Sequence, residues 1–364
     1  MTPRITVGLP VYKGADLINE ALDCLQRQTF GNFEVIISVD GNDLATAAAC
    51  RPFLIDSRFR MVVHPVQLDW VGNFNWLLRQ DLREFFCYRQ HDDITTPEFF
   101  ETLLRVSDRE PKAAAIYCDC QFQGGSNHVE IARTIRGEPM DRVRRYIEDM
   151  SSAAPVRGLI RREAIRHAGL VRSDEFRAPM EVFVWLAKLL RWGNFRRVAK
   201  PFYYRLDHPH TFSRQFERTP EDRKRAVLTT LFTGLLEAAM PLCTTHEERR
   251  FLHQAIVDQI VVRSRWYGIE ASQTLMEECL ERLIYEGNTH LLTEKEMPAI
   301  LCGLQLRQHV ERSQTRKALY RMRRESQMAT FIYPTSQWRR VLYQVCRLLD
   351  RIRLKIKWIL TSSF

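Results

Sequence analysis

Two adjacent carboxylates, Asp92 and Asp93, point more directly to chemistry than any other residues of this chain. They follow the apolar run 84–88, which predicts a buried strand. They precede the segment 96–98, whose threonine, proline and glutamate are typical of a helix start. Ligands of open α/β sheets bind at the edge where the strands end. Neighbouring carboxylates repel each other unless they are compensated, so the pair predicts a divalent metal that bridges to a diphosphate or, alternatively, two solvated turn residues.

Three further candidates lie at predicted strand ends or at the start of a helix. Tyr12, which follows the first strand together with Pro10, could stack on a nucleobase or could simply be a turn residue. Asp40, after the second strand, is placed to accept a hydrogen bond from a base N–H, or to form an Asp-Gly turn. Glu181 could act as a general base, although a helix dipole alone also favours an acid near its start.

The elements that must position these residues alternate between strand and helix through the first third of the chain. Apolar runs predict strands at 5–9, 33–39, 59–63, 84–88 and 113–117. Helical spacing of apolar residues predicts helices at 17–25, 45–55 and 70–82. Such repeated units with short loops indicate an α/β fold with a doubly wound, mostly parallel sheet.

The pattern is mixed from about residue 121 to 220 and purely helical afterwards. The mixed part predicts a hairpin or loop at 123–127, strands at 156–160, 195–198 and 201–206, and a helix at 180–190. The helical part predicts helices at 225–239, 246–267, 271–285 and 297–314. The predicted organisation is an α/β domain at 1–220, an α-helical region at 221–335 and a last helix at 336–364.

Composition excludes several classes of protein. Hydrophobic content of 45% and charged content of 27% are ordinary for a soluble globular chain, and the net charge of +10 predicts a negatively charged partner. Nine scattered cysteines without a C-x-x-C pair indicate a reducing compartment rather than a disulfide framework or a zinc site. Neither a dinucleotide-binding glycine motif nor a P-loop is present. No secretory signal or membrane-spanning apolar run is seen, so a cytoplasmic location is expected.

The last segment, 336–364, is predicted to be a basic amphipathic helix. It carries seven basic residues against one acidic residue, beside a stripe of apolar side chains. Such a helix suits an anionic membrane surface, or it packs on the helical region with its basic face in solvent. Nucleic acid is not expected as a partner, because the basic residues come without a recognisable nucleic-acid-binding module.

In order along the chain, four features resemble the family 2 inverting glycosyltransferases. They are Pro10-Val11-Tyr12, the run LQRQTFGNFEVI at 25–36, Asp40-Gly41 and Asp92-Asp93. The resemblance covers about residues 4–215 and is strongest up to residue 97. It implies the GT-A fold, a nucleotide-binding α/β domain, with a nucleotide-diphosphate sugar as the donor.

The resemblance also implies a role for each candidate residue. Pro10 and Tyr12 would line the nucleobase pocket, and Asp40 would hydrogen-bond the base. Asp92 would lie near the ribose, and Asp93 would bind the Mn²⁺ or Mg²⁺ that bridges the diphosphate.

The same resemblance implies a catalytic base for the acceptor and a histidine at the metal or diphosphate site. Glu181 would deprotonate the acceptor hydroxyl as it attacks the anomeric carbon, which inverts the sugar. The run 203–209 resembles a family segment whose histidine joins the metal or diphosphate site, so His208, or else His210, is expected there.

The chain also departs from the family pattern. Asp40 stands alone where the family usually has two acids, and methionine precedes the expected base. Phe74-Asn75 replaces the usual Arg-Asn, so that Asn75 or Asn73 would substitute for the arginine by hydrogen bonding. The Q-x-x-R-W motif of processive enzymes is absent, which favours transfer of a single sugar.

The expected function is a metal-dependent, inverting glycosyltransferase acting on a glycan or lipid-linked acceptor, in surface polysaccharide or lipopolysaccharide assembly. Peripheral attachment to the cytoplasmic face of a membrane is expected from the basic helix. The departures leave open a catalytically silent GT-A module that serves as a sugar-binding or scaffold subunit. Nucleotidyl transfer is disfavoured, because the glycine-rich, lysine-bearing phosphate loop is absent.

Overall fold

The computed structural model describes residues 2–150, 152–173, 179–209, 211–269, 275 and 278–279. All of these residues belong to one compact unit within residues 1–301. The helix predicted at 297–314, most of the helix predicted at 271–285, the basic helix predicted at 336–364 and the fallback ligand His210 lie outside the described residues. The domain boundaries at 220 and 335 stay predictions.

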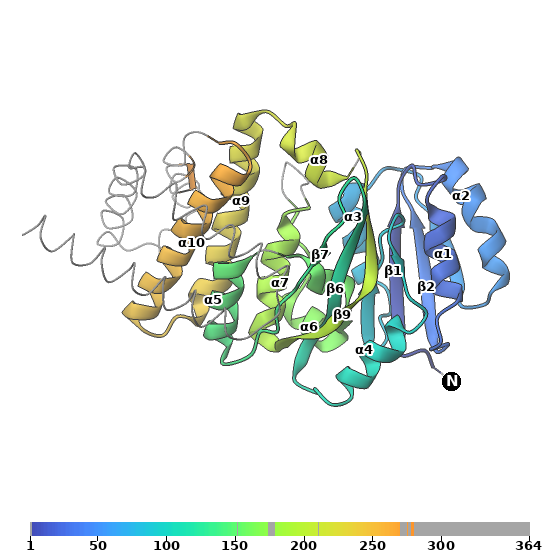
Figure 1. The fold of residues 1–364 in the computed structure, drawn as a ribbon, viewed down its shortest axis with the longest axis horizontal. Helices are drawn as coiled ribbons and strands as arrows, with labels where there is room; N and C mark the ends of the chain where they lie inside the picture. Colours follow the sequence, from blue (N-terminus) through green and yellow to red (C-terminus); the bar gives the residue numbers. More distant parts are fainter. Residues whose placement is uncertain are drawn as a thin grey trace, which may run out of the picture. The chain divides into compact units, whose positions relative to one another are not determined.

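A nine-stranded sheet in the described part of the chain has the order β3-β2-β1-β4-β8-β6-β9-β5, with β7 beside β6 (Figure 1). The strands are β1 Ile5–Val11, β2 Phe33–Val39, β3 Phe59–Val63, β4 Phe85–Tyr88, β5 Ile94–Thr95, β6 Ala113–Gly124, β7 Val129–Glu130, β8 Leu159–Arg161 and β9 Asn194–Asp207. The pairings β1–β2, β1–β4, β2–β3 and β6–β9 are parallel. The antiparallel pairings of β5, β7 and β8 span two residue pairs each. The predicted mostly parallel α/β sheet is confirmed.

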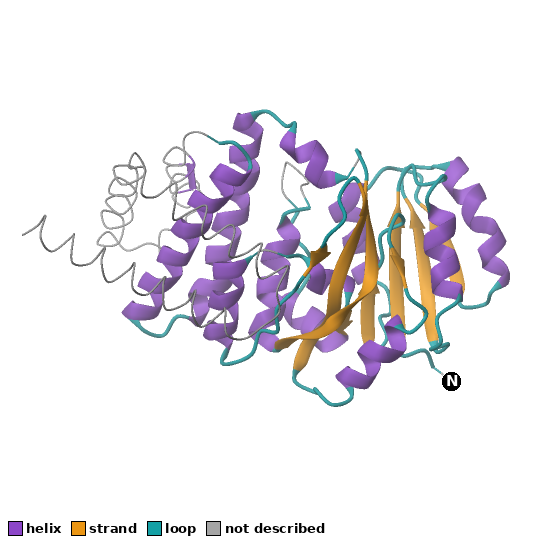
Figure 2. Ribbon diagram, in the orientation of Figure 1, coloured by secondary structure: helices purple, strands orange, loops and turns teal. Residues whose placement is uncertain are grey.

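Helices cover both faces of this sheet (Figure 2). In the α/β part they are α1 Ile18–Gln26, α2 Leu44–Cys50, α3 Asp69–Leu78, α4 Phe99–Ser107, α5 Pro139–Asp149, α6 Arg162–Ala168 and α7 Glu181–Trp192. Phe74 of α3 contacts Phe86, and Phe100 of α4 contacts Phe33. Phe33 and Phe85 both align with Ile5 of β1, and successive strand residues point to opposite faces. Phe86 and Phe33 therefore face opposite helix layers, as a doubly wound sheet requires.

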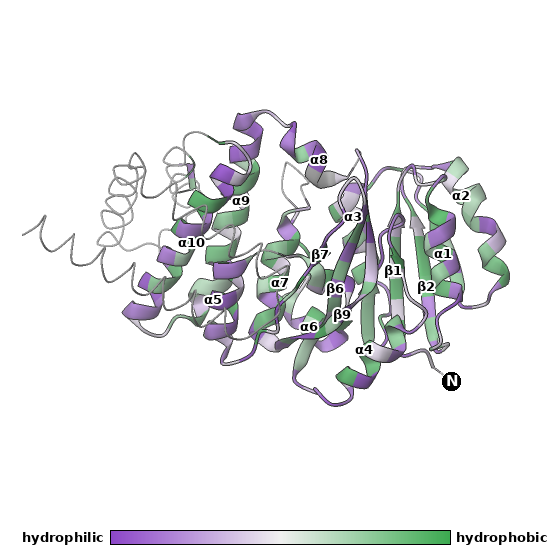
Figure 3. Cartoon of the chain, viewed as in Figure 1, coloured by the Kyte–Doolittle hydropathy of each residue, from purple (hydrophilic) through white to green (hydrophobic). Residues whose placement is uncertain are grey.

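Burial on both faces explains why these strands read as apolar runs rather than as alternating patterns. Every side chain of β1 is buried, and only Glu34 in β2 is partly exposed. Figure 3 shows the same contrast, with apolar strands inside and hydrophilic residues on the outward faces of the helices.

Three local predictions were wrong in detail. The segment 156–160 is not one strand, because the 3₁₀ turn η2 Ala154–Arg157 precedes the antiparallel strand β8. The two strands predicted at 195–198 and 201–206 form the single strand β9, with an irregular register near Pro201. The helix α4 begins at Phe99 rather than at residue 97, because residues 97 and 98 form a turn between β5 and the helix.

The helix α8 Phe212–Glu217 ends the part predicted to be mixed, and the predicted helical region is present as α9 Glu221–Ala239, the 3₁₀ turn η3 Met240–Leu242 and α10 His246–Trp266. Thr245 and Glu248 form a capping box that starts α10. The side chain of Gln259 in α10 donates to the backbone of Glu148 in α5 at 2.8 Å, so that the helical region is fastened to the α/β part. Among the described helices, none is long and apolar enough to cross a bilayer. The seven described cysteines are all buried, free thiols.

Candidate active site

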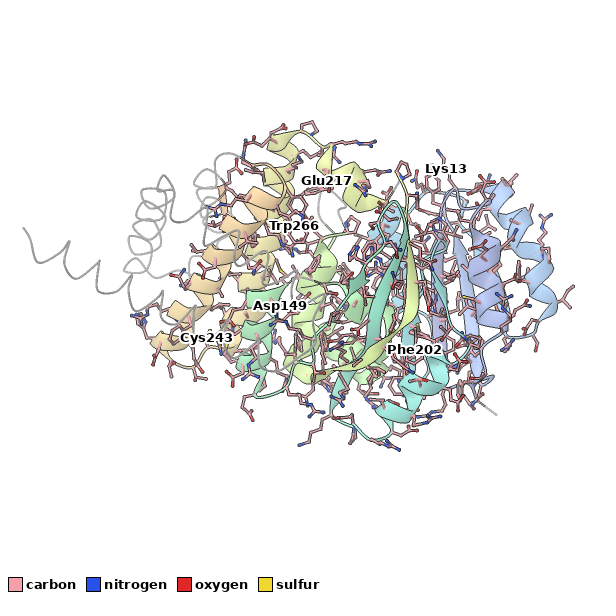
Figure 4. The ribbon with its side chains drawn as sticks, in the orientation of Figure 1. Lys13, Asp149, Phe202, Glu217, Cys243 and Trp266 are labelled. Carbon is pink, nitrogen blue, oxygen red and sulfur yellow. The ribbon has the colours of Figure 1, made fainter. Side chains whose placement is uncertain are left out.

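The parallel order β2-β1-β4 brings three strand ends to one edge of the sheet. Tyr12 follows β1, Asp40 follows β2 and Asp92 comes shortly after β4. Lys13, labelled in Figure 4, marks this edge at the top of the view. The polar candidates from the first part of the sequence therefore share one side of the molecule, where ligands of such sheets bind.

Tyr12 presents an aromatic ring at this edge, with the residue 40% exposed. The Lys13 ammonium lies 5.1 Å from the ring centroid, a cation–π distance. Lys13 has a φ of 51°, which is uncommon for a residue with a side chain, and its N–H donates to Asp43 at 2.7 Å. A Cβ on Gly41 would lie 3.5 Å from the ring, and Gly41 has a φ of +68° that glycine adopts freely. The ring is thus held in place and suited to stacking on a flat base.

Asp40 is almost fully buried, 2% exposed, at the end of β2. Its carboxylate accepts from the backbone N–H groups of Leu68 at 2.7 Å and Asp69 at 3.0 Å. Burial raises the pKa of Asp40 although these bonds act in the opposite direction. The carboxylate therefore holds the start of α3 against β2, and a nucleobase N–H would be an additional donor to this carboxylate.

Pro10, the other residue expected beside the base, is buried within β1.

Asp93 points into the protein and is 2% exposed. The Tyr203 hydroxyl donates to its carboxylate at 2.7 Å, and the Arg157 Nε lies 3.6 Å from the same oxygen. Burial, and then the charge of Asp92, raise the pKa of Asp93 above its usual range. The carboxylate that the sequence assigns to the metal is therefore engaged by an internal hydroxyl and a guanidinium.

Asp92 lies beside the predicted histidine instead. His208 Nε2 is 3.1 Å from Asp92 Oδ2, while Asp92 Oδ1 is buried and has no hydrogen-bond partner in the described structure. The pairing of β5 with β9 aligns Ile94 with Tyr204, which places the end of β9 against the turn that carries the acidic pair. Asp92 and His208 are 116 positions apart in the sequence, and this strand pairing brings them together.

Phe74, at the position where the family usually has arginine, belongs to the aromatic core. It is fully buried. Its ring contacts Trp70, Phe86, Tyr88 and Trp185, with centroids 5.1–6.0 Å apart. This aromatic cluster joins β4, which leads to the acidic pair, to α7, which carries Glu181.

Both asparagines considered as substitutes for that arginine bond to the protein backbone. Asn75 donates to the Val171 carbonyl at 2.7 Å and accepts from the Val171 N–H at 2.9 Å. Asn73 donates to the Ser38 carbonyl at 3.0 Å and accepts from the Ser38 hydroxyl at 2.5 Å. The structure thus uses Asn75 to hold the segment that leads toward Glu181.

Restoring the family arginine by Phe74→Arg is expected to destabilise the fold rather than to improve donor binding. The substitution would bury a charge among aromatic rings and remove a large apolar side chain, a loss of about 3–5 kcal/mol from the packing alone. Urea unfolding measures the change, with the exposed substitution Leu44→Arg as the control. A variant of wild-type stability would contradict the structural role of Phe74.

Glu181 is the first residue of α7 and is 1% exposed. Arg172 bonds its carboxylate, with Nε 2.9 Å from Oε2 and Nη2 3.4 Å from Oε1. Trp185, one turn further along α7, donates from Nε1 to the Gly169 carbonyl at 2.8 Å. Residues 174–178, between the arginine and the glutamate, lie outside the described structure.

Sequence reasoning missed three residues that contact the predicted site residues: Arg157, Arg172 and Tyr203. Arg157 also donates to Gln90 at 2.9 Å, so it holds the turn before the acidic pair. Tyr203 belongs to the run 203–209, in which the resemblance to the family points only to the histidine. No local pattern marks the two arginines, because their partners come from other elements of the fold.

The donor groups at this edge fit a divalent cation. Asp92 contributes a carboxylate with one unpartnered buried oxygen, and His208 contributes an imidazole nitrogen. Within the described ranges, no cluster of three or more His, Cys, Asp or Glu side chains could hold a metal. Two protein ligands suit Mn²⁺ or Mg²⁺, since these ions keep waters and substrate phosphate oxygens at their remaining positions.

A parallel sheet with an aromatic ring and carboxylates at its carboxyl edge is typical of ligand-binding α/β proteins. The model of the family "Glycosyl transferase family 2" matches residues 6–169. This part of the chain is therefore similar to glycosyl transferase family 2, as its sequence motifs predict.

Curated relatives are similar to about a third of the chain. An uncharacterized glycosyltransferase of Rickettsia typhi is 23% identical over 129 residues, which cover 35% of this chain and 39% of the relative. An uncharacterized glycosyltransferase of Haemophilus influenzae is 23% identical over 115 residues, which cover 31% of this chain and 36% of the relative. The chain spans no more than about two fifths of the length of the curated relatives it matches.

Two solved structures are also similar. One is S. aureus TarS 1-349, at a TM-score of 0.49 and 15% identity, with 79% of this chain and 92% of that chain covered. The other is the mannosyltransferase PcManGT from Pyrobaculum calidifontis in complex with GDP-Man and Mn²⁺, at a TM-score of 0.48 and 14% identity. The latter match covers 86% of this chain and 89% of that one.

Proposed function

We propose that this chain is an inverting glycosyltransferase that moves a single sugar from a nucleotide-diphosphate sugar to an acceptor hydroxyl. The observation that carries the proposal is the meeting of His208 with Asp92, at 3.1 Å, on the strand edge that also holds Tyr12 and Asp40. The match of residues 6–169 to the model of glycosyl transferase family 2 supports it.

Asp92 and His208 would hold the cation. When bound, Mn²⁺ or Mg²⁺ would neutralise the charge that develops on the diphosphate leaving group. Asp93 would position the turn, because Tyr203 and Arg157 already engage its carboxylate. This assignment exchanges the roles that the sequence suggests for the two aspartates.

The nucleobase side of the site would be formed by the first two strand ends. Tyr12 would stack on the base, Asp40 would accept from its N–H, and Pro10 would shape the end of β1. Asn75 would act indirectly, through the segment that it fastens at Val171.

Glu181 would accept the proton of the acceptor hydroxyl as that oxygen attacks the anomeric carbon. A base on one face of the sugar and a leaving group on the other produce inversion. The carboxylate can do this only while it is ionised, and the contact with Arg172 favours the ionised form.

The acceptor would be a glycan or a lipid-linked glycan, in surface polysaccharide or lipopolysaccharide assembly. The absence of the processive motif in the sequence supports transfer of one sugar. The basic segment 336–364 supports peripheral attachment to the cytoplasmic face of a membrane, and this remains an expectation from sequence.

A panel of nucleotide-diphosphate sugars with Mn²⁺ tests the proposal. At a donor concentration of about 100 Kd, binding should stabilise the fold by about 2.7 kcal/mol, which raises Tm by several degrees. Chelation of the metal should abolish the shift, and addition of acceptor should release nucleoside diphosphate. Failure of every donor to bind or to turn over would contradict the proposal.

A catalytically silent sugar-binding module is the second candidate. One observation favours it: Asp40, Asn75, Asp93 and Glu181 all have partners within the protein. It predicts the metal-dependent shift in Tm without any release of nucleoside diphosphate.

A further inference from the structure

The contact between Arg172 and Glu181 is the start of a chain of charged groups that leads away from the site. Glu181 is 1% exposed, and its side chain is paired with a guanidinium at 2.9 Å. A buried carboxylate without such a partner binds a proton more readily, and the protonated form cannot act as a base. Arg172 therefore provides the positive charge that favours the ionised form of the buried Glu181 carboxylate.

Arg172 is held in turn by α9, in the helical region of the chain. Its Nη1 lies 3.2 Å from the carboxylate of Glu237, and its Nη2 donates to the Thr230 carbonyl at 2.5 Å. Thr230 and Glu237 are seven residues apart, which places them on one face of the helix, two turns apart. The guanidinium thus lies between the base on α7 and one face of α9.

Gly234 leaves the room for this guanidinium. A Cβ at Gly234 would lie 2.6 Å from Arg172 Nη2, 3.1 Å from Cζ and 3.0 Å from a methyl group of Val184. Real Cβ atoms do not approach other atoms at 2.6 Å, so any side chain here would displace the arginine. Glycine inside a helix costs roughly 0.5–1 kcal/mol relative to alanine. The close approach of Arg172 explains why a glycine, Gly234, occurs in the middle of α9.

We propose that α9 positions the base: Arg172, seated against Gly234 and fixed by Glu237, orients the carboxylate of Glu181 and keeps it ionised. This inference rests on the proposed function, in which Glu181 takes the acceptor proton. It assigns a role in the reaction to a helix in which the sequence shows no motif.

Steady-state kinetics on full-length variants test the proposal. Arg172→Met should lower kcat by about 10–100-fold, as expected for loss of a group that orients a reacting residue, with the donor KM changed less than about twofold. Arg172→Lys should recover part of kcat, because it restores a positive charge. Glu237→Gln should have a smaller effect in the same direction. Gly234→Ala should lower kcat without lowering Tm in proportion.

Arg225→Met is the matched control on α9. Arg225 also bonds two acidic side chains, Glu221 and Glu278, and its side chain is 22% exposed, against 24% for Arg172. The control should lower Tm and leave kcat at the wild-type value. If Arg172→Met does not fold, Gly234→Ala and Glu237→Gln carry the test.

The outcomes separate this inference from the proposed function. A Glu181→Gln variant with wild-type kcat would overturn the assignment of the base itself. An inactive Glu181→Gln variant together with wild-type kcat in Arg172→Met and Gly234→Ala would overturn only the role of α9. Losses of kcat that match the loss of folded protein in every variant would also overturn it.

Discussion

Replacing Asp92 with asparagine is expected to lower kcat by roughly a thousandfold and leave the fold intact. The variant loses the charge that would hold the cation, and a metal supplies several kcal/mol of transition-state stabilisation in such sites. The asparagine side chain would keep the size of the aspartate and one acceptor oxygen for His208. Turnover of the donor as a function of Mn²⁺ concentration measures the loss, with urea unfolding as the measure of stability.

Asp93→Ala is the matched control, because it removes the neighbouring carboxylate. The change leaves the Tyr203 hydroxyl and the Arg157 guanidinium without their buried partner, a cost of about 3–5 kcal/mol of stability. Folded Asp93→Ala protein should still bind Mn²⁺ with donor. The reverse pattern, with metal binding lost in Asp93→Ala and kept in Asp92→Asn, would return the metal to Asp93.

Glu181→Gln is expected to lower kcat by about 10²–10⁴-fold, because the amide cannot accept the proton of the acceptor hydroxyl. Donor affinity should stay the same, since the base acts only on the acceptor. At saturating Mn²⁺ the wild-type rate should decline toward low pH as the carboxylate becomes protonated, and the residual activity of the variant should lack this contribution to the decline.

A second acidic residue at the start of a helix provides the control for this result. Glu163 lies in the first turn of α6 and pairs with Arg166 at 3.0 Å, while Glu181, the first residue of α7, pairs with Arg172. Glu163→Gln should leave kcat unchanged. A Glu181→Gln variant with the wild-type rate and the wild-type pH profile would show that another group takes the proton.

Much of the α/β fold follows from local properties of the sequence. Strands buried on both faces must be apolar throughout, and helices that cover them must be apolar on one side, so β1, β2 and α3 are visible as patterns. The turn after each strand is also visible, since it carries the polar residues. The family motifs and the acidic pair lie in this part of the chain, which explains why they could be recognised.

Only the tertiary structure decides which of these polar groups are available for a ligand. Asp92 and Asp93 are equivalent in the sequence, but β9 approaches from another part of the chain and places Tyr203 on one aspartate and His208 on the other. The sequence determines, through periodicity and turn chemistry, that polar and aromatic residues follow the strands at one edge of the sheet. The tertiary structure decides the role of each carboxylate, because burial and charge partners depend on contacts between residues far apart in the chain.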